Sequence, residues 1–391
     1  MESRGLQVAS SFTSAPLKKT FQPLLVKAGI ADEVAFAQYA QMAEYMLGDA
    51  ASAPNIVGTL VLLRIEDWLR DDAKSGAALE PETSRHKLRL HVEDFVGQLG
   101  ALASRGKAVW FLACPSVGWI AEKYKLEGLC RTNTNLLAAR VRNQRQVTML
   151  NWPAAVRAEE IGDRNADRLG QIPFSAEGFR QIAEFVGEQL ERTFVRGMPG
   201  SVTTVGSEAL AGYLAGLGVR VRMFPASNEE RGQVDRLLRT AAAFSLTGEK
   251  PDILDAEVDA VLESGNCTLI AVSDRLGEYG VSGLAAFRVD GETLRVELLA
   301  LSCPVMGKQT EWAVLAGLGH IAAERRCSRI QFEFRASGRN QLILSFLRSI
   351  AEESPDGRFV LAVSEAEAKI RAEAVAPGAW TVELPKCLPH R

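Results

Sequence analysis

The chain has 391 residues, of which 47% are hydrophobic, enough for two packed domains. Its 45 basic and 48 acidic residues leave a net charge of −3, so no excess of positive charge favours binding to nucleic acid or to an anionic membrane. No apolar run reaches the roughly 18 residues needed to cross a bilayer, and no basic segment followed by an apolar one opens the sequence. We therefore expect a folded cytoplasmic protein.

Metal and disulfide chemistry are not indicated. The six cysteines include no Cys-x-x-Cys pair, which argues against a disulfide scaffold and against a zinc site. There are only four histidines, and His86 and His91 are spaced so that they do not share one helical face. We therefore expect reduced thiols and no bound metal.

Strand-like and helix-like segments alternate through the first half of the chain. The runs at 56–65 and 107–115 are nearly continuous in apolar residues, which predicts strands buried on both faces. The segment 175–194 has helical periodicity, with Ser175 as its N-cap. This order predicts a doubly wound, flavodoxin-like three-layer α/β domain over residues 1–198. Other strand-like runs lie at 6–12, 33–39 and 146–151, and other helical patterns begin at Leu17 and cover 87–106.

The pattern changes after a stretch rich in Gly, Pro, Ser and Thr at 195–209. Two or three strands joined by tight turns are predicted at 266–301, where Asp290-Gly291 between alternating runs indicates a hairpin. We therefore expect an antiparallel α+β domain over 199–391. After a further helix, we expect a strand at 329–335, a helix at 339–353 and strands near 358–363 and 379–384.

The strand that ends near Leu301 runs directly into a long helix. Such a junction presents backbone N–H groups at the positive end of a helix dipole, where phosphates and developing oxyanions bind. The alternative is that the glycine in this junction serves only the turn. On the first interpretation, the candidate residues for binding a phosphorylated cofactor are Ser302, Met306, Gly307, Lys308 and Gln309.

The second half of the chain resembles the GNAT acyltransferase fold, whose strand-to-helix loop holds the pyrophosphate of coenzyme A or the phosphate of a phosphopantetheine arm. The motifs "VSDRLGEYGVSG" (272–283), "ALSCPVMGKQTE" (300–311) and "RASGRNQLILSFL" (335–347) are similar, in this order, to the acyltransferase-like part of the FkbH-like family. The motifs "VASSFTSAPL", "LVLLRIEDWL" and "DRLGQIPFSAEGFRQIA" resemble the SGNH-hydrolase-like leading domain of that family. The resemblance extends over about residues 6–353.

Three departures from that family limit what the resemblance implies. The interval between the two halves is too short for the haloacid-dehalogenase-like domain of full-length members, so their glyceryl-loading chemistry is not expected. Pro304 and Gln309 occupy two of the three signature positions of the GNAT loop. Three alanines at 241–243 stand where the family has a threonine-asparagine-glutamine run, and alanine side chains form no hydrogen bonds.

The resemblance also suggests which side chains handle the chemistry. In a GNAT-like reaction the acceptor attacks the thioester directly, and Asp274, Glu278 and Tyr279 are candidates to position or deprotonate it. The alternative for Asp274 and Glu278 is that they are solvated turn residues. Asn340 is expected to hold the pantetheine arm or to stabilise the leaving thiol, or alternatively to cap its helix. Cys303, next to the helix start, is a candidate thiol.

The leading domain is expected to be non-catalytic. Ser10 and Ser11 follow the first strand, where an SGNH hydrolase has its nucleophile, but Gln171 stands where related sequences have histidine and cannot accept a proton. Cys114 ends a predicted strand, and we interpret it as a buried residue or, less favourably, as an acyl-carrying thiol.

We therefore expect an acyltransferase of polyketide or nonribosomal peptide biosynthesis. It would take an acyl thioester from an acyl carrier protein, or from acyl-CoA, and pass the acyl group to an amine, alcohol or thiol acceptor. The alternatives are a catalytically degenerate scaffold that binds carrier proteins and a thioesterase that releases the acyl group to water.

Overall fold

A computed structural model of the chain describes residues 3–38, 41–48, 51, 53–75, 79–144, 146–153, 156–194, 207–248, 250, 252–302 and 305–384. The chain divides into two compact units, unit 1 (Met1–Leu210) and unit 2 (Ala211–Arg391). The boundary expected between residues 198 and 199 lies outside the described residues. Among the helices that are described, none combines the length and the apolar character needed to span a membrane.

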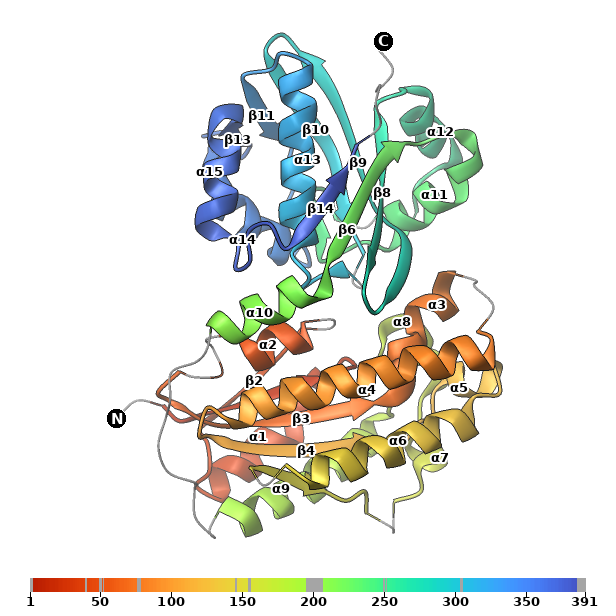
Figure 1. Cartoon of the computed structure of the whole chain (residues 1–391), viewed down its shortest axis with the longest axis vertical. Helices are drawn as coiled ribbons and strands as arrows, with labels where there is room; N and C mark the ends of the chain where they lie inside the picture. Colours follow the sequence, from red (N-terminus) through yellow and green to blue (C-terminus); the bar gives the residue numbers. More distant parts are fainter. Residues whose placement is uncertain are drawn as a thin grey trace. The chain divides into compact units, whose positions relative to one another are not determined.

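Unit 1 is built on a parallel sheet. In the described part of this unit, the strand order is β2-β1-β3-β4-β5, and every neighbouring pair runs parallel (Figure 1). The expected strands are therefore present, with shorter ends than the apolar runs suggested. The strands are β1 (Gly5–Ser10), β2 (Glu33–Phe36), β3 (Ile56–Arg64), β4 (Ala108–Cys114) and β5 (Val147–Leu150).

Helices cover both faces of this sheet. Alternate residues such as Leu60 and Leu62 join a core cluster with Phe21 and Leu25 of the first helix, because successive side chains of a strand point to opposite faces. On the other face, Phe111 contacts Phe95, with ring centroids 5.6 Å apart. The helices are α1 (Lys18–Lys27), α2 (Met42–Leu47), α3 (Arg70–Ser75), α4 (Pro81–Ala103), α5 (Trp119–Lys123), α6 (Glu127–Arg142), α7 (Ala158–Ile161), α8 (Arg164–Gly170) and α9 (Ala176–Phe194), with 3-10 turns η1 (Ala15–Leu17) and η3 (Ile65–Leu69).

Two helix starts show how sequence signals relate to the observed bounds. The Ser175 hydroxyl accepts a hydrogen bond from the Gly178 amide at 3.1 Å, so the predicted N-cap of α9 is confirmed. By contrast, α4 begins at Pro81, ahead of the predicted start at residue 87, since its first residues are polar and carry no apolar periodicity. Proline is well suited to the first turn of a helix, where its missing N–H leaves no bond unmade.

Unit 2 contains a mixed sheet. The strand path among its described residues is β12-β13-β11-β10-β9-β8-β6-β14, and β7 pairs separately with β10. The expected hairpin is confirmed, because Asp290 of β9 pairs with Thr293 of β10 across the turn. The strands are β6 (Val219–Pro225), β7 (Phe244–Ser245), β8 (Cys267–Asp274), β9 (Gly277–Asp290), β10 (Thr293–Leu301), β11 (Arg329–Phe332), β12 (Glu352–Glu353), β13 (Phe359–Ala362) and β14 (Trp380–Glu383).

The antiparallel arrangement expected in this unit is present in part, because the sheet is mixed. β10 pairs with β11 in parallel, and β14 pairs with β6 in parallel. A parallel neighbour needs a crossover connection, and α13 provides it between β10 and β11. The helices of unit 2 are α10 (Ser207–Leu217), which begins before the boundary, α11 (Arg231–Thr240), α12 (Asp255–Glu263), α13 (Thr310–Glu324), α14 (Gln341–Ile350) and α15 (Val363–Glu373), with the 3-10 turn η4 (Asn228–Glu230).

Candidate functional site

Three residues named from the sequence come together in unit 2. The Lys308 Nζ atom lies 2.6 Å from Asp274 Oδ2 and 2.6 Å from the Tyr279 hydroxyl. The Tyr279 hydroxyl is also 3.0 and 3.1 Å from the two carboxylate oxygens of Asp274. The Lys308 ammonium group further lies 4.2 Å from the centroid of the Tyr279 ring, within cation–π range. We call Asp274, Tyr279 and Lys308 the polar triad.

The β8–β9 hairpin positions two members of the polar triad. Asp274 ends β8, and its Oδ1 accepts a hydrogen bond of 2.7 Å from the Leu276 amide, which fixes the carboxylate in the turn. Gly280 (φ +62°) supplies a backbone conformation that most residues avoid, next to Tyr279. The Asp274 side chain is fully buried, whereas that of Lys308 is 16% exposed. The triad therefore has one buried anion and a cation that reaches the surface.

Lys308 comes from the junction between β10 and α13, which has an unusual backbone. Gly307 has φ +71° and Gln309 has φ +62°, so the chain passes twice through the left-handed region before the helix begins. Residues 306–309 form a turn between β10 and α13. The carboxamide oxygen of Gln309 is engaged, since it accepts a 3.0 Å hydrogen bond from the Ala376 amide.

Two of the remaining residues expected in this junction are described, and neither has a side-chain contact with the polar triad among the hydrogen bonds found. Ser302 donates its amide to the Ser282 carbonyl at 2.8 Å, which extends the pairing of β10 with β9 by one residue. Met306 is buried, with 5% of its surface exposed. Cys303, the candidate thiol, and Pro304 lie outside the described residues.

The edge of β10 changes partner halfway along its length. Residues Thr293–Val296 pair with β11, and a register shift toward β9 then follows between Val296 and Leu298. Beyond that point β7 pairs with β10, and the Leu246 amide donates to the Leu299 carbonyl at 2.9 Å. On the other side, the Leu246 carbonyl accepts a 2.8 Å bond from the Arg335 amide. The segment Phe244–Leu246, which we call the wedge, therefore bonds to both diverging chains.

Asn340 holds the wedge in place. Its Nδ2 atom donates to the Ser245 carbonyl at 3.0 Å and to the Arg335 carbonyl at 2.9 Å, and its Oδ1 accepts from the Ser337 amide at 2.9 Å. The residue is fully buried. Phe244 packs on Phe346 of α14, with centroids 5.5 Å apart. The carboxamide of Asn340 thus has a structural task, and its side chain makes no contact with the polar triad.

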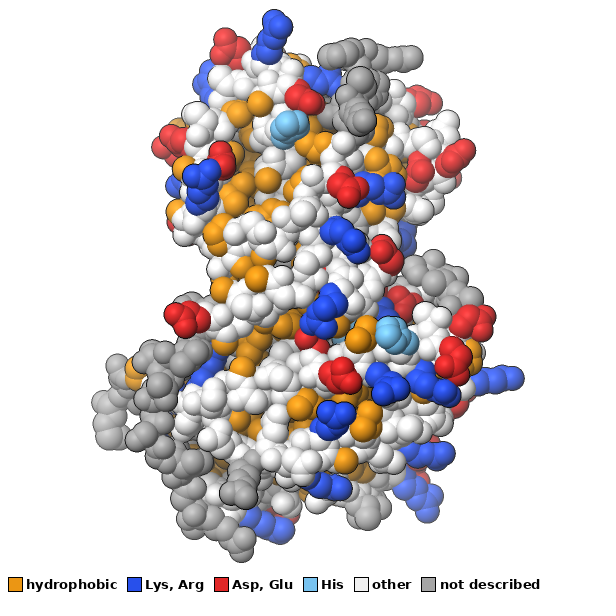
Figure 2. Space-filling model, in the orientation of Figure 1, with side chains coloured by type: hydrophobic (Ala, Val, Ile, Leu, Met, Phe, Trp, Pro, Cys, Tyr) orange, Lys and Arg blue, Asp and Glu red, His pale blue; other side chains and the backbone are white. Residues whose placement is uncertain are grey.

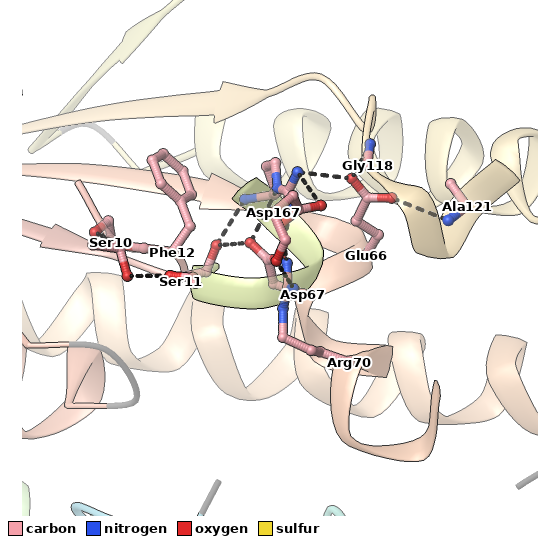
Figure 3. Close-up of polar contacts among 12 residues, drawn as sticks. Ser10, Ser11, Phe12, Glu66, Asp67, Arg70, Gly118, Ala121 and Asp167 are labelled. Carbon is pink, nitrogen blue, oxygen red and sulfur yellow. Dashed lines mark hydrogen bonds and ion pairs between the residues drawn. The ribbon is translucent and has the colours of Figure 1, made fainter. Parts of the chain in front are cut away.

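A second polar cluster lies in unit 1, at the carboxyl ends of β1 and β3 (Figure 3). Arg64 and Arg70 both contact Asp67 at 2.6 Å and Asp167 at 2.9 and 2.6 Å respectively. Glu66 lies 3.3 Å from Arg64. All five side chains are at most 2% exposed. The buried network therefore occupies the sheet edge where open α/β folds usually bind ligands.

The serines beside this network are not activated for attack. The Ser11 hydroxyl donates to Asp67 Oδ2 at 2.7 Å. Burial alone would raise the pKa of Asp67, but the charges of Arg64 and Arg70 outweigh it and lower that pKa. A carboxylate with a lowered pKa is a weak base, so it does not deprotonate a serine. Ser10 is buried and donates to the Phe12 carbonyl at 2.6 Å.

The other candidates in unit 1 are also inert. Burial raises the pKa of the Cys114 thiol to about 12, so it stays protonated at neutral pH. Gln171 has φ +54° at the end of α8, and its backbone carbonyl accepts a hydrogen bond from the Thr13 amide. Among the described residues, no group of His, Cys, Asp and Glu side chains is arranged to hold a metal ion.

Comparisons with known proteins find partial likenesses only. No family model and no curated protein matches the chain. A chimeric spermidine N-acetyltransferase from Vibrio cholerae is 10% identical, with 37% of this chain and 97% of that chain covered and a TM-score of 0.30. An acetyltransferase of the GNAT family from Staphylococcus aureus is 7% identical over 37% of this chain and 99% of its own, with a TM-score of 0.28. An N-acetyltransferase from Thermoplasma acidophilum in complex with coenzyme A is 8% identical over 36% of this chain and 96% of its own, with a TM-score of 0.24. TM-scores of this size do not establish a common fold.

Replacing Asn340 with alanine should loosen the wedge. One buried and one partly buried carbonyl would lose this donor, at a cost of about 2 kcal/mol in the free energy of unfolding. Hydrogen exchange at the Leu246 and Arg335 amides should become faster. Asn228→Ala, at an exposed asparagine, is the control and should change stability by no more than about 0.5 kcal/mol. Unchanged exchange in Asn340→Ala would contradict the structural task.

Gly118→Ala should destabilise unit 1. A Cβ atom at this position would lie 2.4 Å from Asp167 Oδ2 and 2.7 Å from Glu66 Oε1, so the network would have to shift. Overpacking of this kind costs about 1 to 3 kcal/mol, measurable by urea unfolding. The control is Gly97→Ala in α4, where nothing lies within 4 Å of the added atom. That variant should be more stable by up to about 1 kcal/mol.

The network also predicts a pH dependence. The folded pKa of Asp67 is lowered from its ordinary value of 3.8. Its stabilising contribution is therefore complete above the unfolded pKa and is lost as the pH falls through the folded pKa. Asp67→Asn should cost about 3 kcal/mol or more at neutral pH, because two buried arginines lose a partner. The difference from wild type, measured by urea unfolding, should stay level from pH 7 to about pH 4 and shrink below that. A difference that grows on acidification would contradict this assignment.

Proposed function

We propose that unit 2 transfers an acyl group from a phosphopantetheine thioester, carried by an acyl carrier protein or by coenzyme A, to a nucleophilic acceptor. One observation carries the proposal: the Tyr279 hydroxyl is held between the Asp274 carboxylate and the Lys308 ammonium group, next to the start of α13. A phenol in this position can give up a proton and take one back, because the neighbouring cation stabilises the phenolate.

The topology of unit 2 supports the same function. β10 and β11 are parallel and connected through α13, and ligands of parallel strands bind beyond their carboxyl ends. Beyond the carboxyl end of β10 lie the amides of Gly307, Lys308 and Gln309, at the start of α13. In the proposal these amides bind a phosphate of the tether. Lys308 was expected to bind that phosphate as well, but its ammonium group is engaged with Asp274 and Tyr279, so we assign it to proton handling instead.

In the proposed reaction, the acceptor attacks the carbonyl carbon of the thioester, and the bond from that carbon to sulfur breaks. Tyr279 gives its proton to the departing sulfur, so the tether leaves as a thiol. The phenolate, stabilised by Lys308, then takes the proton that the acceptor releases on forming its new bond. Asp274 is a positioning residue, since its carboxylate orients both other groups.

A second function, a scaffold that binds carrier proteins without catalysis, is favoured by the wedge. The edge of β10 beyond Val296 already pairs with Phe244–Leu246, so an extended tether cannot add to that edge as an extra strand. For catalysis the thioester must therefore approach along the α13 junction. A scaffold has no such requirement.

Intact-protein mass spectrometry tests the two functions. The full chain is mixed with acyl-loaded carrier protein, or with acyl-CoA, and with amine, alcohol and thiol acceptors. Transfer predicts that the acyl mass moves from the donor to an acceptor. Loss of the acyl group without an acceptor indicates a thioesterase, and retention with every acceptor while the carrier still binds indicates a scaffold.

Tyr279→Phe should lower the rate of acyl transfer by about 10²-fold or more, because the proton donor is removed while the ring remains. Lys308→Met should lower it to a similar extent. The control is Glu263→Gln, an exposed residue at the end of α12. Its rate should equal that of wild type. A wild-type rate in Tyr279→Phe would remove the polar triad from the mechanism.

A further inference from the structure

The pairing between β8 and β9 skips two residues of β9. The register between these two strands, both labelled in Figure 1, shifts twice, and the skipped residues are Tyr279 and Ser282. A strand with an extra residue of this kind forms a β-bulge, which bends the strand and re-aims its side chains. Gly280, between the two bulges, has φ +62°, a conformation that glycine adopts without strain. The part of the hairpin that carries Tyr279 therefore departs from regular pairing.

The bulge at Ser282 changes which face of the sheet the neighbouring residues of β9 take. In a regular strand Leu284 and Val281, three positions apart, would point to opposite faces, because side chains alternate. Leu284 nevertheless belongs to the apolar cluster under α11 and α12, and Val281 packs against the same cluster. The extra residue thus resets the alternation ahead of Tyr279, whose hydroxyl reaches Asp274.

Ser282 connects the two sides of the polar triad through its own hydrogen bonds. Its hydroxyl donates to the Tyr279 carbonyl at 2.9 Å and lies 3.3 Å from the Gly280 carbonyl. A bulge disrupts the ladder locally, so a side-chain donor for these carbonyls replaces bonds that regular pairing would supply. The Ser282 carbonyl accepts a bond of 2.8 Å from the amide of Ser302, which directly follows β10 and leads toward Lys308.

The hydroxyl of Ser282 depends on these protein partners. Polar side chains at the surface, such as the interspersed acidic and basic residues on the side drawn in Figure 2, can hydrogen-bond to water. Ser282 is buried, with 2% of its surface exposed, so its hydroxyl is costly to leave without a partner. The bond to the Tyr279 carbonyl therefore ties the backbone of Tyr279 to the part of β9 that pairs with β10.

We propose that Ser282 is a positioning residue for acyl transfer. Its hydroxyl holds the backbone of Tyr279 and its carbonyl holds the end of β10, so the phenol stays between Asp274 and Lys308. This role rests on the proposed function, in which the Tyr279 hydroxyl must lie within hydrogen-bond distance of the departing sulfur. If the Ser282 hydroxyl served only stability, its loss would lower the free energy of unfolding and leave Tyr279 in place in the folded protein.

The test compares variants of the full chain at position 282. Ser282→Ala removes the hydroxyl, Ser282→Cys keeps the size of the side chain but leaves only a weak donor, and Ser282→Thr retains the hydroxyl. The matched control is Ser349→Ala in α14. The Ser349 hydroxyl also donates to a carbonyl three residues earlier, that of Phe346, at 2.8 Å. Urea unfolding establishes the conditions under which each variant is folded.

Two quantities are measured for each variant. The first is the rate of acyl transfer, followed by intact-protein mass spectrometry. The second is the chemical shift of the phenolic carbon of Tyr279 in protein labelled with ¹³C-tyrosine, which responds to the hydrogen bonds of the hydroxyl. The chain has five tyrosines, and the signal that is absent from Tyr279→Phe identifies Tyr279.

We expect Ser282→Ala and Ser282→Cys to transfer the acyl group about tenfold more slowly or less, because a small displacement of a reacting group is costly. Both should also shift the Tyr279 signal. Ser282→Thr should restore the rate and the signal, and Ser349→Ala should match wild type in both. A Tyr279 signal at its wild-type position in Ser282→Ala or Ser282→Cys would overturn the proposal. Equal losses of rate in Ser282→Ala and Ser282→Thr would overturn it in favour of packing at this position.

The two measurements separate this inference from the proposed function. Slow transfer with a shifted Tyr279 signal in Ser282→Ala, both restored in Ser282→Thr, supports both. A wild type that transfers no acyl group to any acceptor removes the proposed function and with it the role in transfer, even where the Tyr279 signal still depends on the Ser282 hydroxyl. Transfer by wild type that depends on Tyr279, together with a wild-type rate in Ser282→Ala, removes the role of Ser282 alone.

Discussion

Unit 2 depends on the point at which β10 and β11 part. Up to Val296 the two strands share parallel hydrogen bonds, and beyond it their backbone groups need other partners, because buried unpaired amides and carbonyls are costly. The wedge supplies those partners to both chains and is itself fastened by Asn340. With its edge satisfied, β10 continues into the junction from which Lys308 reaches the hairpin. The polar triad therefore lies next to the point where the wedge separates β10 from the chain that follows β11.

In unit 1, buried charged side chains occupy the carboxyl-terminal edge of the parallel sheet. Parallel sheets leave an open edge at the carboxyl ends of their strands, which enzymes commonly use for ligands. Here two arginines and three carboxylates fill that edge and are almost wholly buried. A buried ion network adds little net stability compared with apolar packing, yet it is costly to disrupt. The carboxyl ends of β1 and β3 are thus occupied by the protein's own charged side chains.

The sequence allowed correct prediction of those features that depend on a few neighbouring residues. The cap at Ser175 and the hairpin at Asp290-Gly291 each depend on a few neighbouring residues, and both are present. Asp274, Tyr279 and Lys308 were each named, but their contact joins positions 34 residues apart, which no spacing rule reveals. The wedge was missed because its strand has two residues and shows no periodicity. Arg64 was missed because an arginine at the end of a strand is usually solvated, and its ion pair with Asp167, from a distant segment, explains its burial.

Gln309 illustrates how narrowly one position can be constrained. Its backbone adopts a left-handed conformation, which asparagine and glycine tolerate best, while its side chain must reach the Ala376 amide ahead of the final strand. Glycine would meet the first demand and fail the second, and a β-branched residue would fail both. Few side chains satisfy the two together, so most substitutions at this position would strain the backbone or leave the buried Ala376 amide without its acceptor.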